Sequence, residues 1–142
     1  MALIVPYLIL PGLDAVRFSW THVGRLLQMA SFAGFAAGLA VLACVMRENT
    51  NLSRFMDIQP GQRVITSGPY KFMRHPLYAA MSVYFVCVTL ALGSFWGLLP
   101  GAALVVLHVV RTALEDRTLL RDLPVCREYA AHVRFRLLSG LW

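Results

Sequence analysis

The sequence predicts an all-α membrane protein, a polytopic bundle of transmembrane helices with three or four crossings, a tight helical hairpin and a cytoplasmic C-terminal helical segment. Of the 142 residues, 58% are hydrophobic and only 14% are charged, whereas a soluble domain usually has about 25% charged residues. Two long stretches, 26–46 and 79–110, contain no Asp, Glu, Lys or Arg. The charged residues gather mainly in 47–78 and 111–142. The length of 142 residues suits a single membrane domain, which covers residues 1–142.

Residues 1–25 form an apolar segment that is interrupted by Pro6 and Pro11. No basic segment precedes its apolar run and no convincing cleavage site follows, which favours retained structure over a secretory signal. Residues 1–13 are interpreted in two ways. A short or broken span would give four crossings, and an interfacial segment would give three.

Residues 26–46 predict the first complete transmembrane helix. The run has no charge over its whole length, and about 20 helical residues cross a typical hydrocarbon core. Gly34 and Gly38 lie four residues apart in it, a spacing that allows another helix to approach closely. A homo-oligomer that packs through these two glycines is one expectation, and an incidental run of small residues is the other.

Residues 79–110 are too many for one crossing, and Gly93 to Gly97 lie near their middle. We therefore expect two short helices joined by a tight turn, with Pro100 in the first turn of the second helix, where proline is tolerated. Residues 111–142 mix cations with apolar side chains, which predicts an interfacial helix, broken near Pro124, that returns to the membrane.

The distribution of arginine predicts the orientation of the chain. A hairpin crosses twice, so the segments 47–78 and 111–142 lie on one side, and their Arg content makes that side cytoplasmic in an inner or plasma membrane. The same bias explains the net charge of +6. No basic stretch interleaved with aromatic residues predicts nucleic-acid binding. The three cysteines form no C-x-x-C pair, so neither a metal site nor a disulfide framework is expected.

The first cluster of reactive side chains lies directly before the hairpin. Pro76 suits the first position of the following helix, because its missing N–H has no helical partner there. Arg74 and His75 would then lie at a helix N-terminus, where free N–H groups favour an anion. Tyr70 and Tyr78 add aromatic faces that can stack on a base or contact a cation. The alternative is an ordinary juxtamembrane loop whose Arg and Tyr side chains anchor the interface.

The second cluster follows the hairpin. His108, Arg111 and Glu115 have the spacing of one helical face, and Asp116 comes next. Polar groups at membrane depth usually face a cavity or a partner. The alternative is an interfacial ion pair between Arg111 and Glu115, with His108 satisfied inside the bundle. The chain has no G-x-G-x-x-G after a strand, no P-loop and no G-x-S-x-G. Soluble nucleotide-binding folds are excluded, because no room remains for a domain of alternating strands and helices.

Taken together and in this order, the two clusters resemble the isoprenylcysteine carboxyl methyltransferase family, whose superfamily includes the phospholipid N-methyltransferases. The resemblance covers Val64–Trp142. Its motifs are Gly68-Pro69-Tyr70-x-x-x-Arg74-His75-Pro76-x-Tyr78, a hairpin, Arg111-x-x-x-Glu115-Asp116-x-x-Leu119, Glu128-Tyr129 and Val133-Arg134-Phe135-Arg136. The acidic pair, often two glutamates in that family, is here Glu115-Asp116.

The resemblance implies an integral membrane methyltransferase that uses S-adenosyl-L-methionine to methylate a lipophilic acceptor at a carboxylate, amine or thiol. Its partners would be the lipid bilayer and a lipid or another membrane-soluble substrate, without a metal. The residues carried over as cofactor-binding are Tyr70, His75, Pro76, Leu77, Tyr78, Glu115, Asp116, Leu119 and Arg134. The residues carried over as catalytic are Arg74, His75, Arg111 and Glu115.

Within this set, the resemblance makes Arg74, Arg111 and Arg134 the candidates for the carboxylate of the cofactor or for an anionic acceptor. An amine acceptor would also lose a proton, for which His75 and Glu115 are the candidates. Two alternatives remain open. A membrane reductase of the steroid-reductase type would use NADPH, and a non-catalytic membrane subunit would bind a partner through Gly34 and Gly38.

Overall fold

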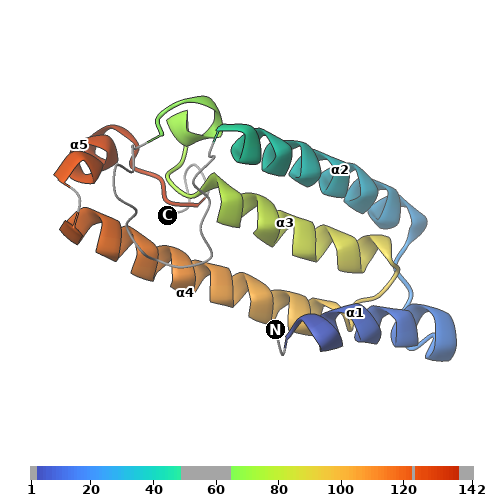
Figure 1. Ribbon diagram of the computed structural model, residues 1–142. Helices are drawn as coiled ribbons and strands as arrows, with labels where there is room; N and C mark the ends of the chain where they lie inside the picture. Colours follow the sequence, from blue (N-terminus) through green and yellow to red (C-terminus); the bar gives the residue numbers. More distant parts are fainter. Residues whose placement is uncertain (1–2, 49–64, 123, 138–142) are drawn as a thin grey trace. The chain divides into compact units, whose positions relative to one another are not determined.

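The computed structural model describes residues 3–48, 65–122 and 124–137, and these residues contain no β-strand. Its elements are α1 (Ile4–Gly12), the π-helix η1 (Leu13–Phe18), α2 (Arg25–Glu48), the 3₁₀ helix η2 (Gly68–Lys71), α3 (Pro76–Ala91), α4 (Leu98–Asp122) and α5 (Pro124–His132). Figure 1 shows them along the chain. The predicted all-α class is confirmed for the described residues. Residues 49–64 of the predicted loop and 138–142 of the predicted tail lie outside them.

In the described ranges, two helices are long and apolar enough to cross a membrane. They are α2, with 24 residues, and α4, with 25 residues. At about 1.5 Å per residue, either helix exceeds the roughly 30 Å of a hydrocarbon core. The apolar helix α3 is shorter, with 16 residues. The number of crossings and the orientation stay predictions.

The hairpin is confirmed, but its second helix is longer than predicted. The turn after α3 contains Gly93 with φ of 85°, a backbone conformation that glycine adopts without strain. Helix α4 then continues through residues 111–122, which the sequence had suggested would start a separate interfacial helix. No glycine or proline occurs from residue 102 to residue 123, so nothing local ends the helix earlier. The predicted break near Pro124 is confirmed, because α5 begins at that residue.

The chain forms two compact units, and the first comprises Met1–Leu39 and Ala80–His108. Within it, α2 and α3 approach closely at the two glycines. A Cβ atom at Gly34 would lie 2.7 Å from the Cys87 sulfur, and one at Gly38 would lie 3.7 Å from the Ala80 carbonyl oxygen. The close approach that the glycine spacing predicts therefore occurs within one chain. A homo-oligomer through the same residues remains a proposal.

A buried carboxylate joins two loops of this first unit. Asp14, in η1, is fully buried and accepts a hydrogen bond from the Thr21 N–H at 2.8 Å. It also accepts hydrogen bonds from the hydroxyls of Thr21 and Ser94, each at 2.5 Å. Ser94 lies in the turn between α3 and α4, so Asp14 ties the N-terminal segment to the tip of the hairpin.

The second unit comprises Ala40–Ala79 and Val109–Trp142. Tyr78, Ala79 and Leu137 form its small apolar core, against which Met73 and Leu77 pack. The chain after α5 is extended and runs beside the loop that precedes α3 (Figure 1). This pairing brings the C-terminal segment to the residues that the sequence selected as reactive.

Candidate functional site

The loop before α3 is built by a glycine, a proline and a short 3₁₀ helix. Gly68 has φ of 55°, a conformation that favours glycine, and a Cβ atom there would lie 3.0 Å from the Cγ atom of Glu48, which would have to shift. The Ser67 hydroxyl donates a hydrogen bond to the Glu48 carboxylate, which ties the loop to the end of α2. Helix η2 then carries Tyr70, whose side chain is buried.

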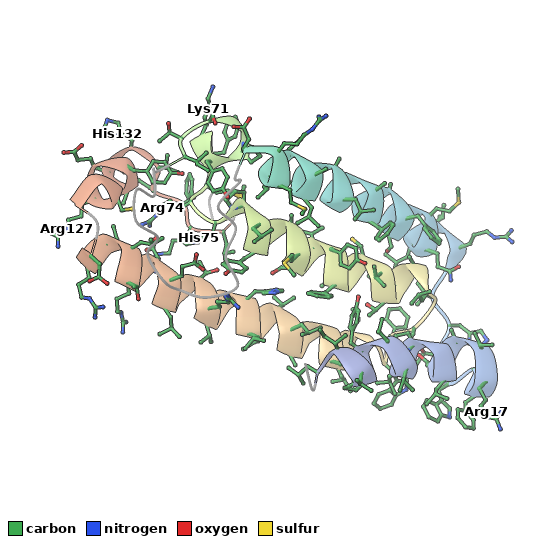
Figure 2. All side chains as sticks on the ribbon, viewed as in Figure 1. Arg17, Lys71, Arg74, His75, Arg127 and His132 are labelled. Atoms are coloured by element: carbon green, nitrogen blue, oxygen red, sulfur yellow. The ribbon has the colours of Figure 1, made fainter. Side chains whose placement is uncertain are left out.

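Two backbone hydrogen bonds hold the next residues of this loop. The N–H groups of Arg74 and His75 donate to the carbonyl oxygens of Phe135 and Arg136, both at 2.9 Å. Pro76 begins α3, as predicted, and is fully buried. Figure 2 shows Arg74 and His75 on the inner side of the loop, whereas Lys71 projects outward. The two hydrogen bonds and the start of α3 hold the backbone of Arg74 and His75, so their side chains project from it in defined directions.

Asp116 is the centre of the polar cluster in this unit. Its side chain is 4% exposed, and its oxygens lie 2.8 and 3.0 Å from Nη1 of Arg74. Nε of Arg136 lies 2.9 Å from Oδ2, and Nε2 of His75 lies 3.3 Å from Oδ1. Two guanidinium groups thus surround one carboxylate, and the excess positive charge suits an anionic ligand.

Tyr78 is the centre of a second group of contacts. Its hydroxyl donates a hydrogen bond of 2.7 Å to Oε2 of Glu115. The guanidinium carbon of Arg111 lies 5.7 Å from the centre of the Tyr78 ring, within the range of a cation–π contact. The ring of His75 is nearly parallel to it, at 6.1 Å between centres. Tyr78 therefore links His75, from the first cluster, with Arg111 and Glu115, from the second.

Helix α4 supplies the acidic half of the site with a spacing of one turn. Arg111 and Glu115 lie four residues apart, as do Thr112 and Asp116, so each pair shares a helical face. His108 begins the predicted row of polar residues, but the contact that the structure shows for its ring is stacking on Phe85, in the first unit, at 5.5 Å.

The structure brings six of the predicted site residues into direct contact with one another. They are Arg74, His75, Tyr78, Arg111, Glu115 and Asp116. Leu77 packs against the apolar core, and Leu119 is half-buried on α4. Arg134 is exposed and contributes its carbonyl oxygen, which accepts a hydrogen bond from Nη2 of Arg74 at 3.3 Å. Tyr70 likewise contributes its carbonyl oxygen, which accepts a hydrogen bond from the Tyr129 hydroxyl.

Sequence reasoning missed two supports of the site, Arg136 and Tyr129. The hydroxyl of Tyr129, in α5, donates a hydrogen bond of 2.5 Å to the carbonyl oxygen of Tyr70. Burial, and then the nearby Tyr70 hydroxyl, raise the pKa of Tyr129 to about 12, so the group is a donor at neutral pH. Arg136, rather than Arg134, reaches Asp116 with its side chain. No sequence pattern distinguishes these two arginines, because the choice depends on how the extended segment pairs with the loop.

The donor set of this cluster suits an organic ligand that carries charged groups. Among the residues that the structure describes, no group of three or more His, Cys, Asp or Glu side chains could hold a metal ion. The cluster instead offers guanidinium groups, an aromatic face and the carboxylate of Glu115. Such a set can bind a ligand that carries both an anionic and a cationic group.

Comparison with known proteins supports the resemblance inferred from the motifs. A family model described as phospholipid methyltransferase matches residues 27–122, which is more than half of the chain. The matched segment contains both clusters, from Arg74 to Asp116, and the hairpin between them. Neither the curated proteins nor the solved structures gave a significant match.

Proposed function

This chain belongs to the phospholipid methyltransferase family, and on that basis we propose that it transfers a methyl group from S-adenosyl-L-methionine to a lipophilic acceptor in the membrane. The observation that carries the proposal is the contact set around Tyr78 and Asp116. It joins Arg74 and His75 of the loop with Arg111 and Glu115 of α4. Family membership supplies the reaction class, and this cluster supports a cofactor site.

The charges of the cluster fit those of the cofactor. S-adenosyl-L-methionine carries a carboxylate, an ammonium and a sulfonium group. Nε of Arg74 is buried and has no hydrogen-bond partner within residues 3–48, 65–122 and 124–137, so a donor is available for the carboxylate. Glu115 accepts one hydrogen bond from Tyr78, and an ionised carboxylate has about four acceptor sites. We therefore assign Arg74 and Arg111 to the carboxylate, and Glu115 with the Tyr78 ring to the cationic groups.

The contacts of Asp116 favour a different role from the one that the resemblance implies. Both of its oxygens contact Arg74, and they also contact His75 and Arg136. A carboxylate so occupied is poorly placed to contact a ligand directly. We propose that Asp116 is a positioning residue, which orients Arg74 and His75 toward the cofactor.

The main task of the protein in this reaction is to align the acceptor atom with the methyl group of the cofactor. The bound cofactor supplies a methyl group on a sulfonium sulfur, which an acceptor atom attacks in line. Holding two reactants in that geometry contributes up to about 7–11 kcal/mol in well-oriented systems. Carboxylate and thiolate acceptors need no base. An amine acceptor must lose a proton, and Glu115 or His75 would accept it.

The membrane setting completes the proposal. Helices α2 and α4 are long and apolar enough to cross a bilayer. We propose that the acceptor enters from the lipid and that the cluster faces the cytoplasm, because positively charged segments are retained on that side. A carboxylate, an amine and a thiol all remain acceptor candidates, as in isoprenylcysteine or phospholipid substrates.

Calorimetry on the detergent-purified chain tests the cofactor. S-adenosyl-L-methionine is expected to bind, and Glu115→Ala or His75→Ala is expected to abolish binding. Glu128→Ala is the matched control, because the side chain of Glu128 is exposed on α5. Absence of binding at millimolar cofactor would overturn the proposal.

Two further readouts address the alternative functions. Stabilisation by NADPH in a thermal melt, without any by S-adenosyl-L-methionine, would support a reductase. Stable co-purification with another membrane protein, without cofactor binding, would support a non-catalytic subunit. The family match favours neither alternative.

A further inference from the structure

The hydroxyl of Thr112 is a buried polar group without a role in the contacts described so far. Thr112 lies on α4, is fully buried, and its hydroxyl has no hydrogen-bond partner among the described residues. Leaving such a group unpaired destabilises the folded chain. A hydroxyl of this kind next to a reactive cluster therefore indicates a place where a ligand supplies the missing partner.

Other helical hydroxyls of this chain show that a local partner was available. The hydroxyl of Ser31 donates to the carbonyl oxygen of Leu27 at 2.7 Å. The hydroxyl of Thr89, which is also fully buried, donates to the carbonyl oxygen of Val86 at 2.9 Å. Serine and threonine in helices commonly bond in this way to their own backbone. The hydroxyl of Thr112 makes no such bond.

Thr112 lies one helical turn from Asp116, the centre of the polar cluster. Thr112 precedes Asp116 by four residues on α4, so the two side chains share one face of the helix. Arg74, held by Asp116 through Nη1, carries the second relevant unpaired atom, its buried Nε. Nη2 of the same guanidinium donates to the carbonyl oxygen of Arg134. Thr112, one helical turn before Asp116, and Arg74, paired with Asp116, thus each carry a buried donor that has no acceptor among the described residues.

We propose that the Thr112 hydroxyl and the Arg74 Nε–H together bind one anionic group of the ligand. The inference rests on the proposed function. The group is a carboxylate or phosphate that accepts from both donors, and hydrogen bonds of this charge-assisted kind are stronger than neutral ones. It belongs either to the cofactor, as its carboxylate, or to a lipid acceptor, as its headgroup. Thr112 is then a binding residue of this chain that the sequence did not indicate.

Substitution of Thr112 by its isostere provides the test. Thr112→Val removes the hydroxyl and keeps the shape, whereas Thr112→Ser keeps the hydroxyl. Thr89→Val is the matched control, because it removes a fully buried hydroxyl that already has a backbone partner. We expect Thr112→Val to weaken ligand binding by about tenfold or more, as for a lost hydrogen bond to a charged group. Thr112→Ser and Thr89→Val should bind ligand as the wild-type chain does.

Two probes distinguish the sources of the anionic group. If the group is the cofactor carboxylate, calorimetry will show that Thr112→Val weakens the binding of S-adenosyl-L-methionine. The binding of 5′-methylthioadenosine, which lacks the carboxylate, will be unchanged. If it is a headgroup, cofactor affinity will be unchanged. Thr112→Val will then need more lipid to reach half-maximal transfer of labelled methyl into vesicles of total host lipid. Either pattern supports the inference.

The contrary outcomes are equally definite. Equal values for Thr112→Val and the wild-type chain in both assays would overturn the inference and leave the proposed function standing. A wild-type chain that does not bind S-adenosyl-L-methionine would overturn both. In a thermal melt without ligand, Thr112→Val should be as stable as the wild-type chain or more stable. A lower melting temperature than that of Thr89→Val would indicate a structural partner for the hydroxyl and contradict the inference.

Discussion

Arg74 and Asp116 lie 42 residues apart in the chain and form a buried ion pair, with one guanidinium nitrogen 2.8 and 3.0 Å from the two carboxylate oxygens. The two side chains are 10% and 4% exposed. Arg74 belongs to the loop before α3 and Asp116 to α4, so this pair joins the two sequence clusters that suggested a methyltransferase. Removing one partner of such a pair leaves an uncompensated buried charge.

Asp116→Asn tests this pair directly. The amide keeps the shape but removes the negative charge that Arg74 contacts in the buried pair, so we expect a loss of about 3–5 kcal/mol in the free energy of unfolding. Thermal melts in detergent measure the change. Asp122→Asn is the control, because its partner Arg121 is 74% exposed and ion pairs between exposed side chains contribute little to stability. Equal shifts for both variants would contradict the assigned role of Asp116.

Tyr78→Phe tests the hydrogen bond to Glu115. The variant removes the hydroxyl that donates to Glu115 at 2.7 Å and keeps the ring beneath Arg111. This bond orients the Glu115 carboxylate that we assign to the cationic groups of the cofactor, so its loss should weaken cofactor binding. Calorimetry measures the affinity. Tyr78→Ala, which also removes the ring, should bind more weakly still, and indistinguishable values for the two variants would count against a role of the ring.

Gly34→Val tests the approach of α2 to α3. An added Cβ would lie 2.7 Å from the Cys87 sulfur, and overpacking of this kind costs about 1–3 kcal/mol. The melting temperature should therefore fall, and Cys87→Ala in the same chain should restore part of it. Gly24→Ala is the control, since a Cβ there has nothing within 4 Å. A melt unchanged by Gly34→Val would show that α3 does not approach at this residue.

Asp14 predicts how stability depends on pH. Burial alone would raise the pKa of this carboxyl, but hydrogen bonds from Ser94 and Thr21 outweigh it and lower the pKa. The stabilisation is therefore complete above the pKa of an unfolded Asp, about 3.9, and is lost as the pH falls through the lower folded value.

Asp14→Asn should make the melting temperature less dependent on pH below pH 4, and thermal melts from pH 7 to pH 3 measure the slope. The same variant should be less stable at pH 7. The side-chain amide nitrogen of the new asparagine is itself a donor and would face the Thr21 N–H or the Ser94 hydroxyl, which donate to Asp14 in the wild-type chain. An unaltered slope would indicate that another group dominates acid unfolding.

Tyr129→Phe tests the anchor between α5 and the loop. It removes the hydrogen bond to the Tyr70 carbonyl oxygen, which should cost about 1 kcal/mol. Because the folded pKa of Tyr129 is raised to about 12, the wild-type chain loses this contribution as the pH rises from about 10, the unfolded pKa, to that value. Melts at pH 8 and pH 11 of both chains should converge at the higher pH. A constant difference would contradict the assignment.

Local features of the sequence predicted the helical elements with their main breaks. Pro76 begins α3 and α5 begins at Pro124, because proline has no N–H to donate and is favoured only in the first turn of a helix. Gly93 marks the turn of the hairpin. The prediction failed at residue 111, where a change from apolar to charged residues suggested a new helix but α4 continues. The residues of a helix can change from apolar to charged along its length while its backbone hydrogen bonds continue without a break.

The sequence by itself determined the membrane character, the order of the helices and the two groups of residues that carry the family resemblance. These properties follow from composition, from helical period and from proline and glycine, all of which act over a few residues. Only the tertiary structure decided that Asp116 is surrounded by Arg74, His75 and Arg136, and that the Thr112 hydroxyl has no partner in the part of the chain that the structure describes. Which side chains meet depends on how segments distant in the chain pack together. One extended segment, paired with the loop before α3, selects Arg136 over Arg134 for the same carboxylate.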